Sequence, residues 1–367
     1  MILEVNSPSV NFKKVLRILL GTFFLVLGIS GCNKFNTNEI KGYAQGTTYS
    51  IKYLGKPDYN LKLSIDSMLS EIDSSLSTYK SFSLVSRVNN TDSVYQIDEH
   101  FYAVLSKSLE IYKTSNGSFD PTIKPLIDFW GFGDEKTQEI QYIDSLAILK
   151  ILEQIGSDKV KIIDNFGKSV DILEKYDSKK EYFFSKPKGI KLDFNAIAQG
   201  YSIDVIAAFF LNKGITNFMI ELGGEVRANG KNQQNQLWKI GIDKPEMNQN
   251  KRALKAILSL DNRSVATSGN YRKYYFTKGK PIFHTLNPKT GFPIYSNPII
   301  LSATVVANDC ISADGYATAI MSAENMNMAL NMINHNSIQA YLVYQDTITK
   351  EIKSYLSENL KLSLEEL

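Results

Sequence analysis

An acid and a hydroxyl stand four residues apart in the stretch SADGYATA, residues 312–319. At that spacing Asp314 and Thr318 would lie on one face of a helix, one turn apart. A carboxylate and a hydroxyl oxygen suit a hard cation such as Mg²⁺. The pair also has a purely structural interpretation, in which an acid lies near a helix N-terminus and a threonine bonds back to the helix carbonyls. The spacing alone leaves both interpretations open.

Further stretches combine glycine with polar or aromatic residues: AQGTTYS, GSFDPTIKPLIDFWGFG, LDFNAIAQGYSID, IELGGEVRANG and HTLNPKTGFPI. Glycine at strand ends lets backbone N–H groups approach phosphates, and helix N-termini favour anions. Aromatic and amide side chains suit a flat heteroaromatic ring. Together they are compatible with a nucleotide-like ligand and Mg²⁺. The sequence has neither GxxxxGK followed by Ser or Thr, nor GxGxxG after a strand, so neither a P-loop nor a Rossmann site is supported.

The elements that would position these residues follow from apolar periodicity. Helices are predicted over residues 61–76, 99–115 and 143–155, from Ala196 or Ala198 to Asn212, and through Ala313. Strands are predicted within TTYSIKYLG, KVKIIDN, SVDILEK, GIKLDFN, FMIELGG, WKIGIDKP, ALKAILSL and LSATVVAN, with a terminal hairpin in IQAYLVYQDTITKEIKSY. Without internal repeats or linkers, the pattern predicts an α+β fold, as one mixed α/β domain over residues 43–360.

The composition is that of an ordinary globular protein. The 367 residues are 43% hydrophobic and 22% charged, with a formal net charge of +3. No basic block is present, so nucleic acid is not expected as a partner. Three His and two Cys are too few to indicate a zinc site.

The N-terminus resembles a bacterial lipoprotein leader. Lys13, Lys14 and Arg17 precede a mostly apolar run over residues 18–29, which ends in ISGC. We therefore expect a signal peptide over residues 1–31, lipid on Cys32, a tether over 32–42 and a membrane-anchored, extracytoplasmic (periplasmic) domain. A plain signal peptide with an incidental Cys is the alternative. If Cys32 carries lipid, Cys310 has no disulfide partner.

Eight segments, in order, resemble the ApbE family of FAD:protein FMN transferases: GTTYSIKY, STYKSFSLVSRVNN, GSFDPTIKPLIDFWGFG, LDFNAIAQGYSID, LGGEVRANG, VATSGNYRKYY, HTLNPKTGFPI and ADGYATA. The resemblance extends from Tyr43 to the C-terminal strands. It implies FAD as substrate, Mg²⁺ as cofactor, and transfer of FMN to a Thr or Ser hydroxyl of a target protein with release of AMP. It also implies that the target is a subunit of an exported or membrane redox complex.

The resemblance assigns site residues position by position. Flavin contacts are implied for Gln45, Tyr79, Ser118, Phe119, Asp120, Asp193, Gln199, His284 and Thr285. Metal ligands are implied for Ala196, Asp314, Ala317 and Thr318, with each alanine offering its backbone carbonyl. Gln45 stands where the family usually has Met, Gln199 where Lys or Glu is common, and Leu84 where an acid is usual. These departures bear on the ring and ribose contacts and leave the metal motif intact.

The chemistry implied is displacement at the FMN phosphorus, for which the acceptor hydroxyl needs a base. His284 is the first candidate because its ordinary pKa lies near neutrality, and Asp193 is the second. Two other functions stay open on the sequence. One is a Mg²⁺-dependent FAD pyrophosphatase, and the other is a flavin-binding lipoprotein that scavenges without turnover.

Overall fold

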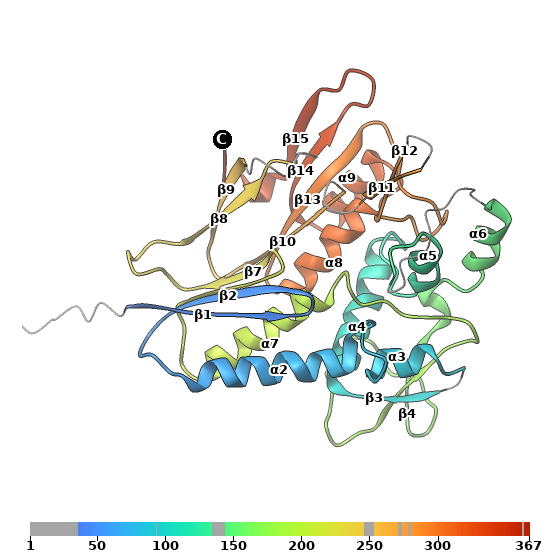
Figure 1. The fold of residues 1–367 in the computed structure, drawn as a ribbon, viewed down its shortest axis with the longest axis horizontal. Helices are drawn as coiled ribbons and strands as arrows, with labels where there is room; N and C mark the ends of the chain where they lie inside the picture. The colour runs from blue at the N-terminus through green and yellow to red at the C-terminus, as the bar shows by residue number, and fades with distance from the viewer. Residues whose placement is uncertain are drawn as a thin grey trace, which may run out of the picture. The chain divides into compact units, whose positions relative to one another are not determined.

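The architecture is built on one eight-stranded antiparallel sheet. The computed structural model describes residues 36–92, 94–133, 144–245, 253–270, 274–277, 280–361 and 363–367. The sheet order is β1-β2-β6-β7-β10-β13-β14-β15. The strands are β1 (Thr37–Ala44), β2 (Thr47–Leu54), β6 (Phe218–Leu222), β7 (Glu225–Asn229), β10 (Ser264–Gly269), β13 (Ile299–Ala307), β14 (Gln339–Gln345) and β15 (Ile352–Leu356). Strands from both ends of the chain thus share one sheet (Figure 1).

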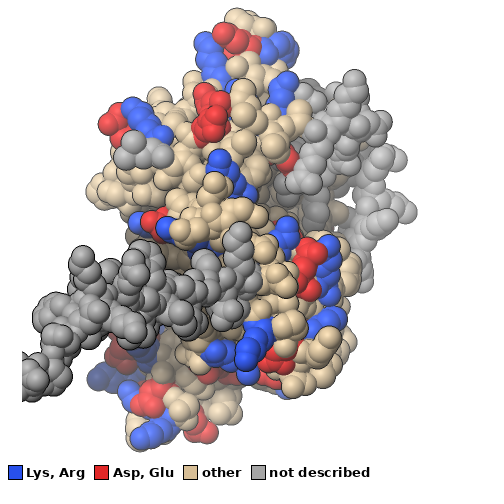
Figure 2. Space-filling model, turned by 90° about the vertical axis from the view of Figure 1, so that its left-hand side faces the viewer, with Lys and Arg blue, Asp and Glu red and all other residues tan. Residues whose placement is uncertain are grey.

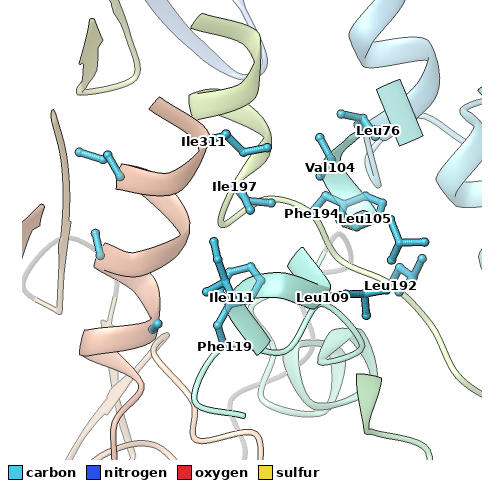
Figure 3. Close-up of a cluster of buried hydrophobic side chains, with 14 of the residues drawn as sticks. Leu76, Val104, Leu105, Leu109, Ile111, Phe119, Leu192, Phe194, Ile197 and Ile311 are labelled. Atoms are coloured by element: carbon cyan, nitrogen blue, oxygen red, sulfur yellow. The ribbon is translucent and has the colours of Figure 1, made fainter. Parts of the chain in front are cut away.

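Helices cover one face of this sheet. The described helices are α2 (Asn60–Leu76), α3 (Leu84–Asn89), α4 (Glu99–Thr114), α5 (Lys124–Phe129), α6 (Ser145–Leu152), α7 (Ala198–Asn212), α8 (Cys310–Met321) and α9 (Met326–His335), with 3₁₀ turns η1 (Ser157–Lys159) and η2 (Glu358–Leu360). Alternate residues of a strand face opposite sides, and Ala303 and Val305 of β13 join the core under α4 and α8. Figure 3 shows Ile111, Phe119, Ile197 and Ile311 in that core.

The other face packs against a small sheet. Val306 of β13 and Tyr341 of β14 join a cluster with Trp238 and Leu258. This second layer is the sheet β16-β9-β8, made of β8 (Trp238–Asp243), β9 (Leu254–Leu260) and β16 (Leu364–Glu366). Two further sheets are β3-β5-β4, from β3 (Tyr95–Ile97), β4 (Lys161–Asp164) and β5 (Tyr182–Ser185), and the ribbon of β11 (Tyr274–Thr277) with β12 (Lys280–Phe283).

Most of the predicted elements are present, and the α+β class is confirmed. Two predicted strands are wrong: residues 169–175 and 189–195 form only the single bridges of Ser169 with Ile163 and of Lys191 with Ile123. Their alternating apolar residues, among them Val170, Ile172, Ile190 and Leu192, pack into or against the core without a strand partner.

The predicted tether over residues 32–42 is also too long, because β1 begins at Thr37. Alternate residues of this segment face the core, where Ile40 and Ala44 pack against the cluster under α2 and α7. At the other end, β16 adds to the predicted domain beyond residue 360. The leader and Cys32 lie outside the described residues.

The surface carries charges of both signs. On the face shown in Figure 2, Lys and Arg side chains are interspersed with Asp and Glu. That face therefore presents no extended patch of one sign that would attract a polyanion from a distance. Among the described helices, none is both long and apolar enough to cross a bilayer.

Candidate functional site

The site is organised by the contact between α7 and α8. A Cβ atom added to Gly200 of α7 would lie 2.4 Å from the Cys310 carbonyl oxygen and 2.9 Å from the Asp314 Cβ of α8. Only glycine allows the two backbones to approach this closely. Gly200 lies beside Asp314, and Asp204 lies beside Cys310, so the helices run in opposite directions where they touch.

Each of these helices supplies an acid that binds the first turn of the other. Asp314 Oδ2 accepts a hydrogen bond from Gly200 N at 3.0 Å. Asp204 accepts from Cys310 N at 2.8 Å and from Ile311 N at 2.9 Å. Helix N-termini leave N–H groups without partners inside the helix. Ile197, the residue before α7, has no side chain that can cap, so Asp314 takes that role.

Asp314 is buried with little compensation. The residue is only 6% exposed. Among the described residues, Gly200 N–H is the single hydrogen-bond donor to its carboxylate. Burial raises the pKa of Asp314 to about 7, and the bond from Gly200 opposes that rise. A bound cation would stabilise the charged form, because it compensates the solvation that the carboxylate has lost. The environment of Asp314 therefore fits a metal ligand.

The other candidate metal ligands are neutral oxygens. Thr318 Oγ1 is half-buried on α8 and lies 3.3 Å from Ser268 Oγ on β10. Ala196 is half-buried in the turn before α7, and among the described residues no backbone N–H donates to its carbonyl. Ala317 is 0% exposed inside α8, so burial favours Ala196 over Ala317 as the carbonyl ligand.

This donor set suits Mg²⁺ better than a transition metal. Within the described part of the chain, no three His, Cys, Asp or Glu side chains gather as a metal site. Mg²⁺ commonly takes one or two carboxylates and completes its shell with waters and substrate phosphates. The described residues thus fit a cation that is shared with a phosphate ligand.

The small residues of SADGYATA prove to serve packing. A Cβ atom on Gly315 would lie 2.4 Å from Ile111 Cδ1 of α4 and 3.2 Å from Ile197 Cδ1. Ala313 and Ala319 are fully buried in the same core. They let α8 lie close to α4, α7 and the sheet.

Two glutamines lie near the first two turns of α7. Gln45 and Gly46 form the two-residue turn between β1 and β2, with φ values of 52° and 73°. Gln45 Nε2 donates to Ser202 Oγ of α7 at 2.7 Å, and its buried Oε1 has no partner among the described residues. A Cβ atom on Gly223 would lie 2.8 Å from Gln199 Oε1. Glycine therefore keeps space for the Gln199 amide at the turn between β6 and β7.

The Ser118–Asp120 segment lies beside Asp193. Asp193 N donates to the Pro121 carbonyl at 2.8 Å. Asp120 Oδ1 accepts from Thr122 Oγ1 and Ser157 Oγ, both at 2.7 Å. Burial raises the pKa of Asp120, and these bonds oppose the rise. The Asp120 carboxylate thus ties this loop to η1, and Ser118, Phe119 and Asp120 are all buried.

Asp193 and Tyr79 lie on neighbouring loops. The Asp193 carboxylate accepts from Asn195 N at 2.8 Å and from Asn195 Nδ2 at 3.1 Å. The same Asn195 Nδ2 lies 3.4 Å from Thr78 Oγ1. Tyr79 follows with a side chain 62% exposed, so its ring is open to a ligand or a partner at the rim of the site.

His284 and Thr285 follow β12 in a turn that a hydrogen bond from Trp130 holds in place. Trp130 Nε1 donates to the Gly291 carbonyl at 2.7 Å, and the His284 ring meets the Phe132 ring edge-on at 6.2 Å between centroids. His284 is half-buried, whereas Thr285 is buried. A Cβ atom on Gly117 would lie 3.2 Å from Lys289 Cε, so this turn lies against the segment that holds Ser118.

Sequence reasoning missed Gly200, Ser202, Asp204, Arg227 and Ser268. Gly200 and Asp204 lie one turn apart in α7, as Cys310 and Asp314 do in α8. The sequence shows this repeated spacing, but it does not show that α7 and α8 pack against each other and pair these residues. Cys310 is a free, buried thiol whose pKa is raised by burial.

The fold and site define a class of protein: an α+β protein in which the buried acid Asp314, neutral oxygens and a helix N-terminus lie together at the contact of two helices. The ApbE family model matches residues 45–342. The chain is 31% identical to the FAD:protein FMN transferase of Haemophilus influenzae over 87% of this chain and 90% of that protein. It is also 31% identical to the FAD:protein FMN transferase of Vibrio cholerae, over 92% and 96%.

Solved structures of flavin transferases have a similar fold. The flavin transferase ApbE from Vibrio cholerae has a TM-score of 0.75 and 26% identity, over 90% of this chain and 99% of that one. The apo form of the Pseudomonas stutzeri flavinyl transferase ApbE has a TM-score of 0.76 and 26% identity, over 90% and 97%. The chain belongs to the ApbE family.

Proposed function

We propose that this protein is a Mg²⁺-dependent FAD:protein FMN transferase. The observation that carries the proposal is the buried Asp314, which has one hydrogen bond among the described residues and stands beside the N-terminus of α7. Relatives that span most of this chain bear that activity in their names. The acceptor would be a Thr or Ser of a subunit in an exported or membrane redox complex.

The reaction balances as a displacement at phosphorus. The acceptor hydroxyl oxygen forms a bond to the FMN phosphorus, the bond from that phosphorus to the AMP oxygen breaks, and AMP leaves. Asp314, Thr318 and the Ala196 carbonyl would hold Mg²⁺, which supplies neutralisation of diphosphate charge when bound. The N-terminus of α7, at Gln199 and Gly200, favours the anionic substrate.

His284 would accept the proton of the attacking hydroxyl. Asp193 is the weaker candidate, since its carboxylate already accepts two hydrogen bonds from Asn195. We expect His284→Ala to lower transfer about 10²–10⁴-fold while FAD affinity is kept. Transfer rate and FAD affinity measured on the same preparation check this. A near-normal rate would move the role to Asp193, for which Asp193→Asn is the matched variant.

The function is tested by incubating the full-length protein with FAD, Mg²⁺ and a candidate redox subunit. Intact mass spectrometry should show the subunit heavier by one FMN, with an equal amount of AMP released. AMP release without any adduct would support a pyrophosphatase instead. Stoichiometric FAD binding without AMP release would support a scavenger and contradict the proposal.

We further propose that the protein is a lipoprotein anchored through Cys32 on the extracytoplasmic side. The ISGC stretch after a basic and apolar leader supports this. Cys32→Ala should move the protein out of the membrane fraction or block its maturation. Fractionation with metabolic lipid labelling measures both, and unchanged labelling of the variant would contradict the proposal.

A further inference from the structure

Asp204 accepts hydrogen bonds from three donor groups at the contact between α7 and α8, yet it has no role in the chemistry proposed above. Its carboxylate accepts from Cys310 N with both oxygens, at 2.9 and 2.8 Å, and from Ile311 N at 2.9 Å. Arg227 Nη1 of β7 also donates to Asp204 Oδ1, at 3.0 Å. Two backbone N–H groups and one cation therefore converge on this side chain.

The start of α8 needs such a partner because it is buried. Cys310 is 0% exposed, and an unpaired buried N–H costs free energy. The side chain of Asp309, the residue before α8, accepts from Ser312 N at 2.9 Å, so it does not cap Cys310 N or Ile311 N. Arg227 Nη1 also donates to the Asn308 carbonyl at 2.8 Å. The Asp204–Arg227 pair therefore joins β7, α7 and the entry to α8.

The position of Cys310 determines that of Asp314. Both belong to α8, one helical turn apart, or about 6 Å of rise. A hydrogen-bonded helix moves as a unit, so a shift at Cys310 is carried to Asp314 and Thr318. At Gly200 the two helices cannot move closer together, because the backbones of α7 and α8 are already in contact there.

We propose that Asp204, paired with Arg227, is a positioning residue that holds α8 in the register in which Asp314 and Thr318 meet the cation. The role of Asp204 rests on the proposed function in one respect: a Mg²⁺–diphosphate ligand must bind beside Asp314 and Thr318. Asp204 would touch neither the metal nor FAD. Its loss would therefore lower metal affinity, and excess Mg²⁺ would restore the rate.

The test compares Asp204→Asn with Asp309→Asn in the full-length protein. Asp309 is the matched control, because its side chain caps the same helix at Ser312 N and, among the described residues, no hydrogen bond joins it to α7. Mg²⁺ is titrated with ADP, a diphosphate that carries no FMN, and the rise of the thermal unfolding midpoint is followed. A second titration follows AMP release from FAD. We expect Asp204→Asn to need about tenfold more Mg²⁺ in both, the lower end of the loss seen for supporting partners of metal ligands.

Asp309→Asn should lose thermal stability and keep the wild-type Mg²⁺ midpoint. A wild-type midpoint in Asp204→Asn would overturn the proposal, as would an equal shift in Asp309→Asn or a wild-type protein that does not respond to Mg²⁺. If Asp204→Asn does not fold, Arg227→Gln replaces it, with the same expectation and the same overturning result. A wild-type protein that responds to Mg²⁺ and ADP but releases no AMP from FAD would refute the proposed function and leave Asp204 testable.

Discussion

The two ends of the α7–α8 contact use the same arrangement for different purposes. At one end, Asp204 binds two N–H groups and Arg227. At the other end, Asp314 binds one N–H group and no cationic side chain among the described residues. Burial raises the pKa of Asp204 to about 6 and that of Asp314 to about 7. Asp204, with three donors, holds the two helices together, and Asp314, with one donor among the described residues, is the acid that we propose binds the cation.

The largest effect should come from Asp314→Asn. Asn can still accept from Gly200 N but lacks the charge that holds a hard cation. We expect AMP release to fall roughly 100-fold or more, since a metal ion is worth several kcal/mol of barrier. AMP release against Mg²⁺ concentration measures this. Asp204→Asn should instead keep most of its rate at high Mg²⁺. If Asp314→Asn has a wild-type rate and Mg²⁺ dependence, the two acids do not differ in the way described.

A smaller effect is expected where the helices touch. Gly200→Ala places a Cβ atom against the Cys310 carbonyl, so the helices must separate. We expect a loss of about 1–3 kcal/mol in the free energy of unfolding, measured by urea denaturation. Gly315→Ala is the matched control, because its new Cβ meets the flexible end of Ile111 and should cost less. A Gly200→Ala protein as stable as the wild type would break the close-contact argument.

The last effect concerns pH in the metal-free protein. The ordinary pKa of Asp314 is 3.8, and its folded value is about 7. Between these values the folded state binds more protons than the unfolded state, so this group lowers the free energy of unfolding as pH rises, up to about 7. Asp314→Asn should therefore gain stability relative to the wild type from pH 4 to about pH 7. Urea titrations with EDTA measure the difference, and a constant difference would contradict the assigned burial.

Local patterns predicted much of this molecule, and long-range contacts account for what they missed. The spacing of Asp314 and Thr318 predicted a shared helix face, and α8 provides it. ALKAILSL was correctly predicted as a strand although its residues favour helix, and β9 pairs on both sides. Asp204 was missed because its partners at Cys310 and Ile311 are about a hundred residues away. Likewise, nothing local indicates that Ser157, 37 positions along the chain, donates to the Asp120 carboxylate.

The contact between Gly200 and Asp314 spans 114 positions of the chain, and this affects how the protein is made. A nascent chain that ends before α8 lacks Asp314 and Thr318 altogether, and its α7 N-terminus has no acid to bind it. Contacts between such distant residues form late and slow the folding of a domain. The proposed site for a metal–diphosphate ligand can thus be completed only after α8 has been synthesised.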